Sequence, residues 1–352
     1  MKILQIVHNW EYYNSLFNLR FNISSLSWDQ IKQLYVYDGF NMGHILTPEL
    51  NALGHETELI IPNNSETQQR WARLNGYFNL SDSEILIKQI NEFNPDILYI
   101  TDPVAFDRDI IDSIKIRPRR VVAWRAAPIP GDADFRKFDI FLTSDLKLSP
   151  LIEAAGCSNI KFHLPGHRNI VEPLSHSVRS PNLVFSGSYG HVHIRRNALL
   201  LQLAMVQLTG AFDFELQFYL ATGSIDKLPV GIGMHCRRPL FGRELLEMYS
   251  SSFSTLHFPI DIAQSNATAM RMFEAIGQGC LMFVHVDAEL FGLFEEDEIV
   301  RFSTPEDLIN KHVFLRDNPS ISSKIAERAR LKCLKSHSMS VRAVQFLEAI
   351  HQ

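Results

Sequence analysis

Short apolar runs alternate with amphipathic stretches in two successive series along the chain, and this pattern constrains the fold most. In the first series we predict strands over Ile3–Val7, Glu58–Ile61, Asp96–Ile100, Val121–Trp124, Ile140–Thr143 and Ile160–His163. Apolar residues at helical spacing predict helices over Met42–Leu53 and over Asp82–Phe93, the second with Ser81 or Asp82 as its N-cap. Residues 8–40 form an aromatic-rich insertion after the first strand. The alternation is typical of an α/β protein with parallel sheets.

A second series of the same elements begins near Asn182. We predict strands over Leu183–Ser186, Glu215–Leu220, Ser254–Phe258 and Leu281–Val286. The predicted helices cover Arg195–Leu208, Gly242–Ser251, Ala267–Ile276, Ser303–Val313 and Ser320–Leu334. Residues 164–181, between the two series, are rich in Pro, Gly and Ser and lack periodicity, as a linker does. The sequence therefore predicts two Rossmann-like domains, with a cleft between the carboxyl ends of their strands.

Length and composition agree with two soluble domains. The chain has 352 residues, of which 46% are hydrophobic and 21% charged. Its net charge of −5 argues against nucleic acid as a partner, because nucleic-acid binders carry a basic face. No apolar run approaches the roughly 20 residues that span a bilayer, and the first residues lack the pattern of a signal peptide. The four cysteines are widely spaced and form no CxxC pair, as in a cytoplasmic protein whose thiols stay reduced. We therefore expect a cytoplasmic protein, and at most a peripheral contact with the inner membrane face.

The first candidate site is a small-residue turn directly after a predicted strand. Its residues are Gly187, Ser188 and Tyr189. Such a turn lets backbone N–H groups approach an anion, and the helix that follows directs its positive end to the same place. Arg195 and Arg196 begin that helix and can neutralise a diphosphate through bidentate hydrogen bonds. A tight turn with solvated arginines is the alternative, and the sequence favours neither.

The second candidate site is the segment from Asp261 to Gly279. Its predicted helix carries Arg271 and Glu274 three positions apart, hence on one face, and ends at glycines before an apolar strand. Periodicity alone favours a simple intrahelical ion pair. The functional alternative places Glu274 on the two hydroxyls of a ribose and Arg271 on a phosphate.

The third candidate is Arg125, which ends a predicted strand before a proline-rich loop. In a doubly wound sheet that position faces the cleft, although an arginine that covers the loop is an equal alternative. Several histidines of the chain are interpreted as structural residues and not as metal ligands or catalytic groups. His191 and His193 lack a third metal ligand, and His163, His167 and His257 are each interpreted as structural.

One acidic pair has the spacing that can hold a divalent ion on a diphosphate. Asp132 and Asp134 form this DxD pattern, but they follow Pro130 and Gly131 in what reads as an exposed loop. We interpret the pair as a solvated turn and expect no metal. The common hydrolase, NTPase and dinucleotide-binding motifs are absent from the sequence.

Five segments together resemble bacterial GT-B glycosyltransferases of the family-1 type, particularly the group related to spore-coat maturation glycosyltransferases. The segments are Ser65–Gly76, Ile90–Asp102, Phe138–His167, Phe185–Leu203 and Thr255–Phe283. The last contains a strand, a D-I-A turn and an M-R-x-F-E-A helix that ends at glycines. The likeness covers most of the chain, excluding parts of residues 8–40 and 222–240. It implies an N-terminal acceptor-side domain over 1–168, a nucleotide-sugar-binding domain over 169–337 and a C-terminal helix, 338–352, that returns to the first domain.

The resemblance implies a hexosyltransferase-like enzyme of polysaccharide biosynthesis. It would move a sugar from a nucleotide diphosphate donor to a glycan, lipid-linked or other acceptor, without a metal or other cofactor. The resemblance places Glu274 on the ribose of the donor. It also implies that Arg195, Arg196 and Arg271 line the diphosphate.

The chain departs from the pattern of these relatives at two positions. Many retaining relatives have a further glutamate eight positions before the ribose-binding one, where this chain has Asn266. We expect Asp261 or Asn266 to replace its contact with the sugar. Arg125 stands roughly where some relatives keep a catalytic histidine, so Arg125 and Asp261 are the candidate catalytic residues. A nucleotide-sugar epimerase, or a non-catalytic protein of this fold that binds a nucleotide sugar or acts as a scaffold, remains the alternative.

Overall fold

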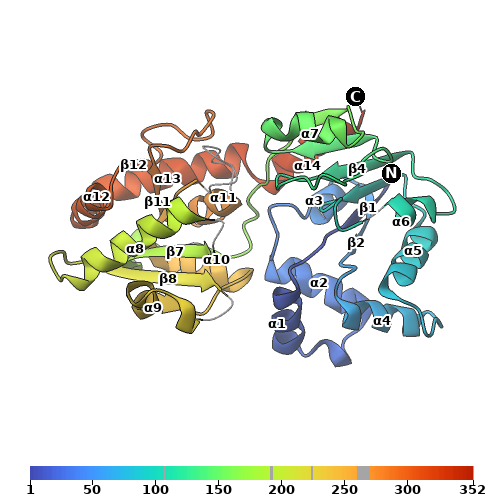
Figure 1. Cartoon of the computed structure of the whole chain (residues 1–352), viewed down its shortest axis with the longest axis horizontal. Coiled ribbons are helices and arrows are strands. Elements are labelled where there is room, and N and C mark those ends of the chain that lie inside the picture. Colours follow the sequence, from blue (N-terminus) through green and yellow to red (C-terminus); the bar gives the residue numbers. More distant parts are fainter. Residues whose placement is uncertain (107, 191–192, 223–224, 260–269, 352) are drawn as a thin grey trace. The chain divides into compact units, whose positions relative to one another are not determined.

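The computed structural model describes residues 1–106, 108–190, 193–222, 225–259 and 270–351. The chain divides into two compact units, one of residues 1–165 and 339–352 and one of residues 166–338. Each unit contains its own six-stranded sheet, and helices flank each sheet (Figure 1). The predicted α/β class with two Rossmann-like halves is confirmed.

All neighbouring strands in the sheet of unit 1 are parallel. Their order is β2 (Glu56–Ile60), β1 (Lys2–Ile6), β3 (Ile97–Ile100), β4 (Arg120–Trp124), β5 (Ile140–Thr143) and β6 (Ile160–Phe162). The strand order reverses direction at β1, which lies between β2 and β3. In open α/β sheets, ligands bind beyond the carboxyl ends of the strands at such a switch point.

Both faces of this sheet are covered by helices. One core cluster joins the sheet to α5 (Asp82–Phe93), α6 (Arg108–Asp112) and α7 (Ser149–Ala154). The opposite cluster joins it to α3 (Thr47–Ala52) and α14 (Met339–His351). Helix α5 has the predicted bounds, and Ser81 and Glu84 form a reciprocal capping box at its start.

The aromatic insertion after β1 folds into two helices, α1 (Glu11–Phe21) and α2 (Trp28–Asp38). The buried Asp38 carboxylate accepts a hydrogen bond from Tyr13 at 2.6 Å and pairs with Arg20 at 2.7 Å, which ties the helices together. The predicted helix over Met42–Leu53 is wrong in its first five residues, because the helix begins only at Thr47, with Pro48 in its first turn. Proline is accommodated there since its missing N–H would have no intrahelical acceptor. Helix α4 (Ser65–Leu74) packs against both α2 and α5.

The sheet of unit 2 is also parallel throughout. Its order is β12 (Val300–Phe302), β11 (Leu281–His285), β10 (Ser252–His257), β7 (Ser180–Ser188), β8 (Glu215–Ala221) and β9 (Cys236–Arg237). This is the strand order of the doubly wound dinucleotide-binding fold, and its switch point lies between β7 and β10.

Helices alternate with these strands along the chain. They are α8 (Ile194–Leu208), α9 (Val230–His235), α10 (Arg243–Ser251), α11 (Met270–Gly277), α12 (Pro305–Asp317) and α13 (Pro319–Ser336). Short 3-10 turns occur at Leu146–Leu148, His176–Val178 and Ile225–Lys227, and another follows α1 at Ile23–Ser25. The first part of the predicted helix over Ala267–Ile276 falls outside the described residues. Among the helices in the described part of the chain, none combines the length and apolarity that a bilayer crossing requires.

Candidate functional site

The predicted glycine turn of unit 2 is wrong in part, because Gly187 and Ser188 belong to β7. They pair with Leu220 and Ala221 of β8, and the N–H of Tyr189 continues the ladder by donating to the Ala221 carbonyl at 3.1 Å. The Tyr189 amide is therefore engaged and does not face a ligand. The strand extends beyond its predicted end at Ser186 because the backbone groups of Gly187 and Ser188 find hydrogen-bond partners along β8.

Gly187 has a different role from that of a turn residue. A Cβ at this position would lie 2.7 Å from Nη2 of Arg271 and 3.1 Å from the Phe185 ring. The absent side chain thus leaves space for the Arg271 guanidinium, which lies 5.0 Å from the centroid of the Phe185 ring. Glycine 187 brings the ends of β7 and α11 together at the switch point.

Arg196 is only 2% exposed. It donates from Nη2 to the Ser188 carbonyl, and its guanidinium lies 5.5 Å from the Phe185 ring centroid. The side chain therefore holds the carboxyl end of β7 and lies near the same Phe185 ring with which Arg271 makes a cation–π contact.

Arg195 lies nearby but is exposed. It pairs with Asp287, which follows β11, and its guanidinium lies 5.6 Å from the Phe258 ring. Asp287 is also 3.6 Å from Nδ1 of His285. Arg195 therefore links the start of α8 to the carboxyl end of β11.

Glu274 is buried on α11, with 6% of its surface exposed. Burial raises the pKa of its carboxyl from 4.5 to about 7, and the positive charge of Arg271 lowers this pKa in part. Among the described residues no ion pair or hydrogen bond engages this carboxylate, so the intrahelical pair that periodicity favoured is not formed. A buried carboxylate without partners is costly and is typical of functional positions.

A histidine completes this group at the end of β10. His257 is 3% exposed, and neither ring nitrogen has a hydrogen-bond partner among the described residues. Desolvation, together with the charges of Arg271 and Arg196, lowers the pKa of His257 to about 3, so the ring is neutral. Asp261 and Asn266 lie outside the described residues.

The carboxyl edge of unit 1 brings together three residues that are far apart in sequence. Nδ1 of His8, which follows β1, is 3.7 Å from a carboxylate oxygen of Asp102, which follows β3. The other oxygen of Asp102 accepts a hydrogen bond from Nη1 of Arg125 at 2.7 Å. Arg125 also donates twice to the Pro128 carbonyl. Sequence analysis selected Arg125 and missed His8 and Asp102, although each directly follows a predicted strand.

Aromatic side chains continue from this edge into α1. Trp10 is 50% exposed, and its ring centroid lies 5.5 Å from that of Tyr12. His8 itself is partly exposed and touches the Phe106 ring edge-on. The edge thus combines an imidazole, a carboxylate and accessible aromatic rings.

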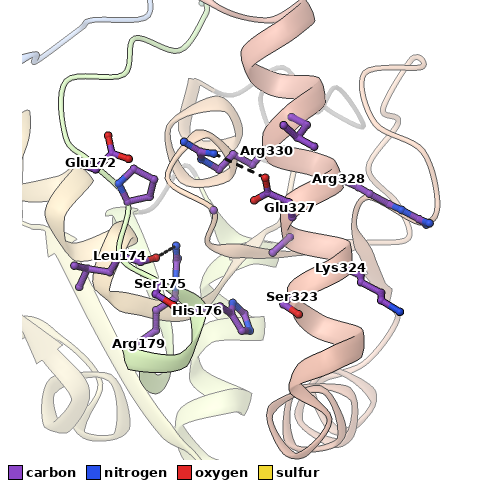
Figure 2. Close-up of a pocket in the computed structure, with 14 residues that line it drawn as sticks. Glu172, Leu174, Ser175, His176, Arg179, Ser323, Lys324, Glu327, Arg328 and Arg330 are labelled. Atoms are coloured by element: carbon purple, nitrogen blue, oxygen red, sulfur yellow. Dashed lines mark hydrogen bonds and ion pairs between the residues drawn. The ribbon is translucent and has the colours of Figure 1, made fainter.

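Two other features lie away from both edges. The carboxylate of Asp134 is bound by Arg136, with which it forms an ion pair, as expected of a surface turn. A cavity of about 620 Å³ in unit 2 is lined by Arg179 and Gly279, which precede β7 and β11, and by α13. It therefore lies at the amino ends of the strands, opposite to the predicted site residues. Figure 2 shows Arg179 bonded to the Leu174 carbonyl and Arg330 facing Glu327, so these cations hold the linker and α13.

Comparison with known proteins adds family information for part of the chain. Residues 191–348 match the model of the family described as glycosyl transferase-like. No curated protein matches the sequence closely enough to count as a relative.

Solved structures resemble the whole chain at low identity. Anabaena HepE, crystallised with UDP and glucose, has a TM-score of 0.60 and 14% identity, covering 100% of this chain and 99% of its own. Sucrose-phosphate synthase from Thermosynechococcus elongatus has a TM-score of 0.57 and 11% identity, covering 100% and 98%. A Rickettsia africae glycosyltransferase has a TM-score of 0.55 and 12% identity, covering 99% and 97%. The chain therefore has the GT-B fold, and its glycosyl transferase-like segment supports a glycosyltransferase, as the resemblance implied.

Proposed function

We propose that this chain transfers a sugar from a nucleoside diphosphate donor to a carbohydrate or lipid-linked acceptor. The observation that carries the proposal is the buried carboxylate of Glu274 beside Arg271, at the switch point of the unit 2 sheet, for which the described residues provide no ion pair or hydrogen bond. This is where a doubly wound sheet binds nucleotides. HepE, a structural neighbour, was crystallised with UDP and glucose, which supports a donor of this kind.

The donor roles follow from the charges at this edge. When ionised, the Glu274 carboxylate can accept hydrogen bonds from two vicinal ribose hydroxyls, which gives a directional contact with the sugar of the nucleotide. Arg271 supplies a positive charge three residues away, and among the described residues no carboxylate forms an ion pair with it. A diphosphate is therefore the natural partner of Arg271.

The acceptor roles are proposed for unit 1. Asp102 orients the His8 imidazole, as the third member of a catalytic constellation orients a base. His8 then takes the proton of the acceptor hydroxyl as that oxygen bonds to the anomeric carbon and the diphosphate leaves with the electron pair. Arg125 is a positioning residue in this account, because its guanidinium holds Asp102 rather than a substrate.

Departure of the diphosphate is proposed to need no metal ion. Arg271 supplies positive charge at this sheet edge, and Arg195 adds to it if it exchanges Asp287 for the diphosphate. Preorganised charge stabilises a leaving anion as a metal would. Arg196 supports departure of the diphosphate indirectly, because its hydrogen bond to the Ser188 carbonyl holds the carboxyl end of β7 in place. In keeping with the resemblance above, we also propose a cytoplasmic role in polysaccharide biosynthesis, with at most peripheral membrane contact, in the spore-coat maturation group.

The proposal is tested by measuring nucleoside diphosphate release from a panel of nucleotide sugars, with and without glycan acceptors. We expect acceptor-dependent release that persists in EDTA. His8→Ala should lower kcat by about 10²–10³-fold, the usual contribution of a positioned base, without weakening nucleotide binding. Release that stops in EDTA and returns with magnesium would contradict the metal-free mechanism. Conversion of the donor sugar without any acceptor would indicate an epimerase instead.

A further inference from the structure

Unit 1 contains a cavity away from the His8 edge. It has a volume of about 240 Å³ and is lined by residues of the edge strand β2 and of α2, α4 and α5. Figure 1 shows where these elements lie in unit 1. The residues that line the cavity are Trp28, Glu58, Ile60, Trp71, Gln89, Glu92 and Phe93. Neither His8 nor Asp102 contributes to its walls, so the cavity is separate from the proposed reacting groups.

One polar side chain that lines the cavity has no hydrogen-bond partner in the described part of the chain. Gln89, on α5, is 4% exposed, and both its amide oxygen and its amide nitrogen are buried without hydrogen-bond partners among the described residues. Buried amides in proteins are nearly always satisfied, because an unpaired donor or acceptor loses its hydration without compensation. Because Gln89 lines the cavity, a small rotation of its side chain would present the amide to a ligand that carries hydroxyl groups.

Two tryptophans give the cavity its apolar character. Trp71 is buried and stacks on Tyr77, with ring centroids 5.9 Å apart and planes at 22°. Trp28 is half-buried and packs against the same cluster. Fixed aromatic rings beside a few placed polar groups are typical of small-molecule sites, and they suit a ring that is apolar on its faces and polar at its rim.

The charges of the lining residues favour a neutral ligand over an anion. No cationic side chain is among the residues that line the cavity, whereas two carboxylates are. Glu58 is bound by Lys32, whose Nζ lies 2.8 and 2.9 Å from its two oxygens, and Glu92 accepts a hydrogen bond from Tyr77 at 2.7 Å. Lys32 balances the charge of Glu58, so Glu92 is the lining charge that disfavours a phosphate or uronate, whereas hydroxyl groups can donate to both carboxylates.

We propose that this cavity binds one neutral pyranose unit of a glycan. Its volume equals that of about eight liquid waters at roughly 30 Å³ each, which suits one sugar ring rather than a chain. Such a site would retain a glycan on unit 1 independently of the reaction. Binding there requires neither donor nor turnover, so it can be tested even if the proposed transfer reaction is incorrect.

Saturation-transfer NMR on the full chain tests the proposal directly. The probes are methyl glycosides of glucose, galactose, mannose and N-acetylglucosamine, compared with glucuronate and glucose 1-phosphate. We expect saturable binding of at least one neutral glycoside and none of the two anions. Gln89→Leu and Trp28→Ala should each weaken this binding at least tenfold. Trp28 is only half-buried, so its variant is expected to fold even if Gln89→Leu does not.

A matched control separates this site from the rest of the molecule. Gln278→Leu removes another buried glutamine whose two amide atoms lack described partners, but it lies in unit 2, and it should leave glycoside binding unchanged. Absence of binding by every neutral glycoside would overturn the proposal, as would binding that survives both cavity variants. Nucleotide affinity, measured on the same samples, reports separately on the proposed donor site.

Discussion

At the scale of single residues, the buried carboxylate of Glu274 carries an electrostatic cost at the unit 2 edge. Its pKa is raised to about 7, chiefly because burial removes the carboxylate from water. Between pH 4.5 and 7 the folded chain therefore retains a proton that the unfolded chain releases. The free energy of unfolding is thus expected to fall as pH rises across this interval and to level off above it.

Glu274→Gln removes this dependence, because the amide stays neutral. At pH 8 the variant should be more stable than wild type by up to about 3 kcal/mol, the equivalent of the pKa shift. At pH 4 the two proteins should have nearly the same free energy of unfolding, since Glu274 is then protonated in both states. Urea denaturation at the two pH values measures the difference. An equal difference at both pH values would show that ionisation is not its source.

The proposed role of His8 as a base also predicts graded effects of substitutions at Asp102 and Arg125. Asp102→Asn should also lower kcat, because the amide no longer fixes the imidazole tautomer, whereas Arg125→Lys should be milder since one cationic contact is kept. Steady-state kinetics of the three variants would test this order. Full activity in Asp102→Asn would show that Asp102 does not orient the His8 imidazole.

At the scale of elements, the contact between the end of β7 and α11 assembles the unit 2 edge. Position 187 has no space for a side chain, because Arg271 and Phe185 occupy it. Any Cβ there must displace the flexible Arg271 end or the strand itself. The position of the Arg271 guanidinium, and with it the proposed diphosphate contact, therefore depends on glycine at position 187.

Gly187→Ala should weaken nucleotide binding by displacing the Arg271 guanidinium. The cost to stability should be about 1–3 kcal/mol, as is usual for an added group in a filled site. Gly190→Ala is the matched control, since nothing lies within 4 Å of its added Cβ. Calorimetric titration with nucleoside diphosphates compares the two. Equal affinities would mean that the β7–α11 contact does not support binding.

At the scale of the whole molecule, the sequence was sufficient for the fold class but not for the strand order. Local apolar periodicity predicts α5 correctly, while strand order depends on pairing between residues that are distant in the chain. His8 and Asp102 illustrate this limit: both follow predicted strands, yet only the adjacency of β1 and β3 brings them within 3.7 Å. The glycine turn failed for a related reason, because the partner strand β8 extends β7 beyond its apolar residues.

Several buried histidines are distributed over both units and stay neutral in the folded chain. Burial lowers the pKa of His163 and His257 to about 3, and that of His167 and His312 to about 4. Each folded-state pKa lies below the ordinary 6.5, so as pH falls through 6.5 the unfolded chain takes up protons that the folded chain does not. Stability is therefore complete above pH 6.5 and is lost toward pH 4, by up to about 1.4 kcal/mol per pH unit for each histidine.

The loss of stability that the buried histidines cause on acidification opposes the gain from Glu274. It is expected to be the larger of the two, because several histidines contribute and only one glutamate does. The urea midpoint of the wild-type chain should therefore be lower at pH 5 than at pH 7.5. Protons should also be taken up on unfolding at pH 5, which a weakly buffered solution can register. A midpoint that rises on acidification would mean that these rings are not buried as neutral groups.

The central claim is that the carboxyl edge of unit 2 binds a nucleoside diphosphate through Glu274. Calorimetric titration of the full chain with UDP, GDP, ADP, CDP and dTDP tests it most directly. The account predicts that at least one of them binds in EDTA, and that Glu274→Ala weakens this binding by about 1.5–3 kcal/mol, the range for a hydrogen bond to a charged group. His8→Ala, in the other unit, should leave the affinity unchanged. Absence of binding by all five, or an affinity that Glu274→Ala leaves within twofold of wild type, would contradict the account.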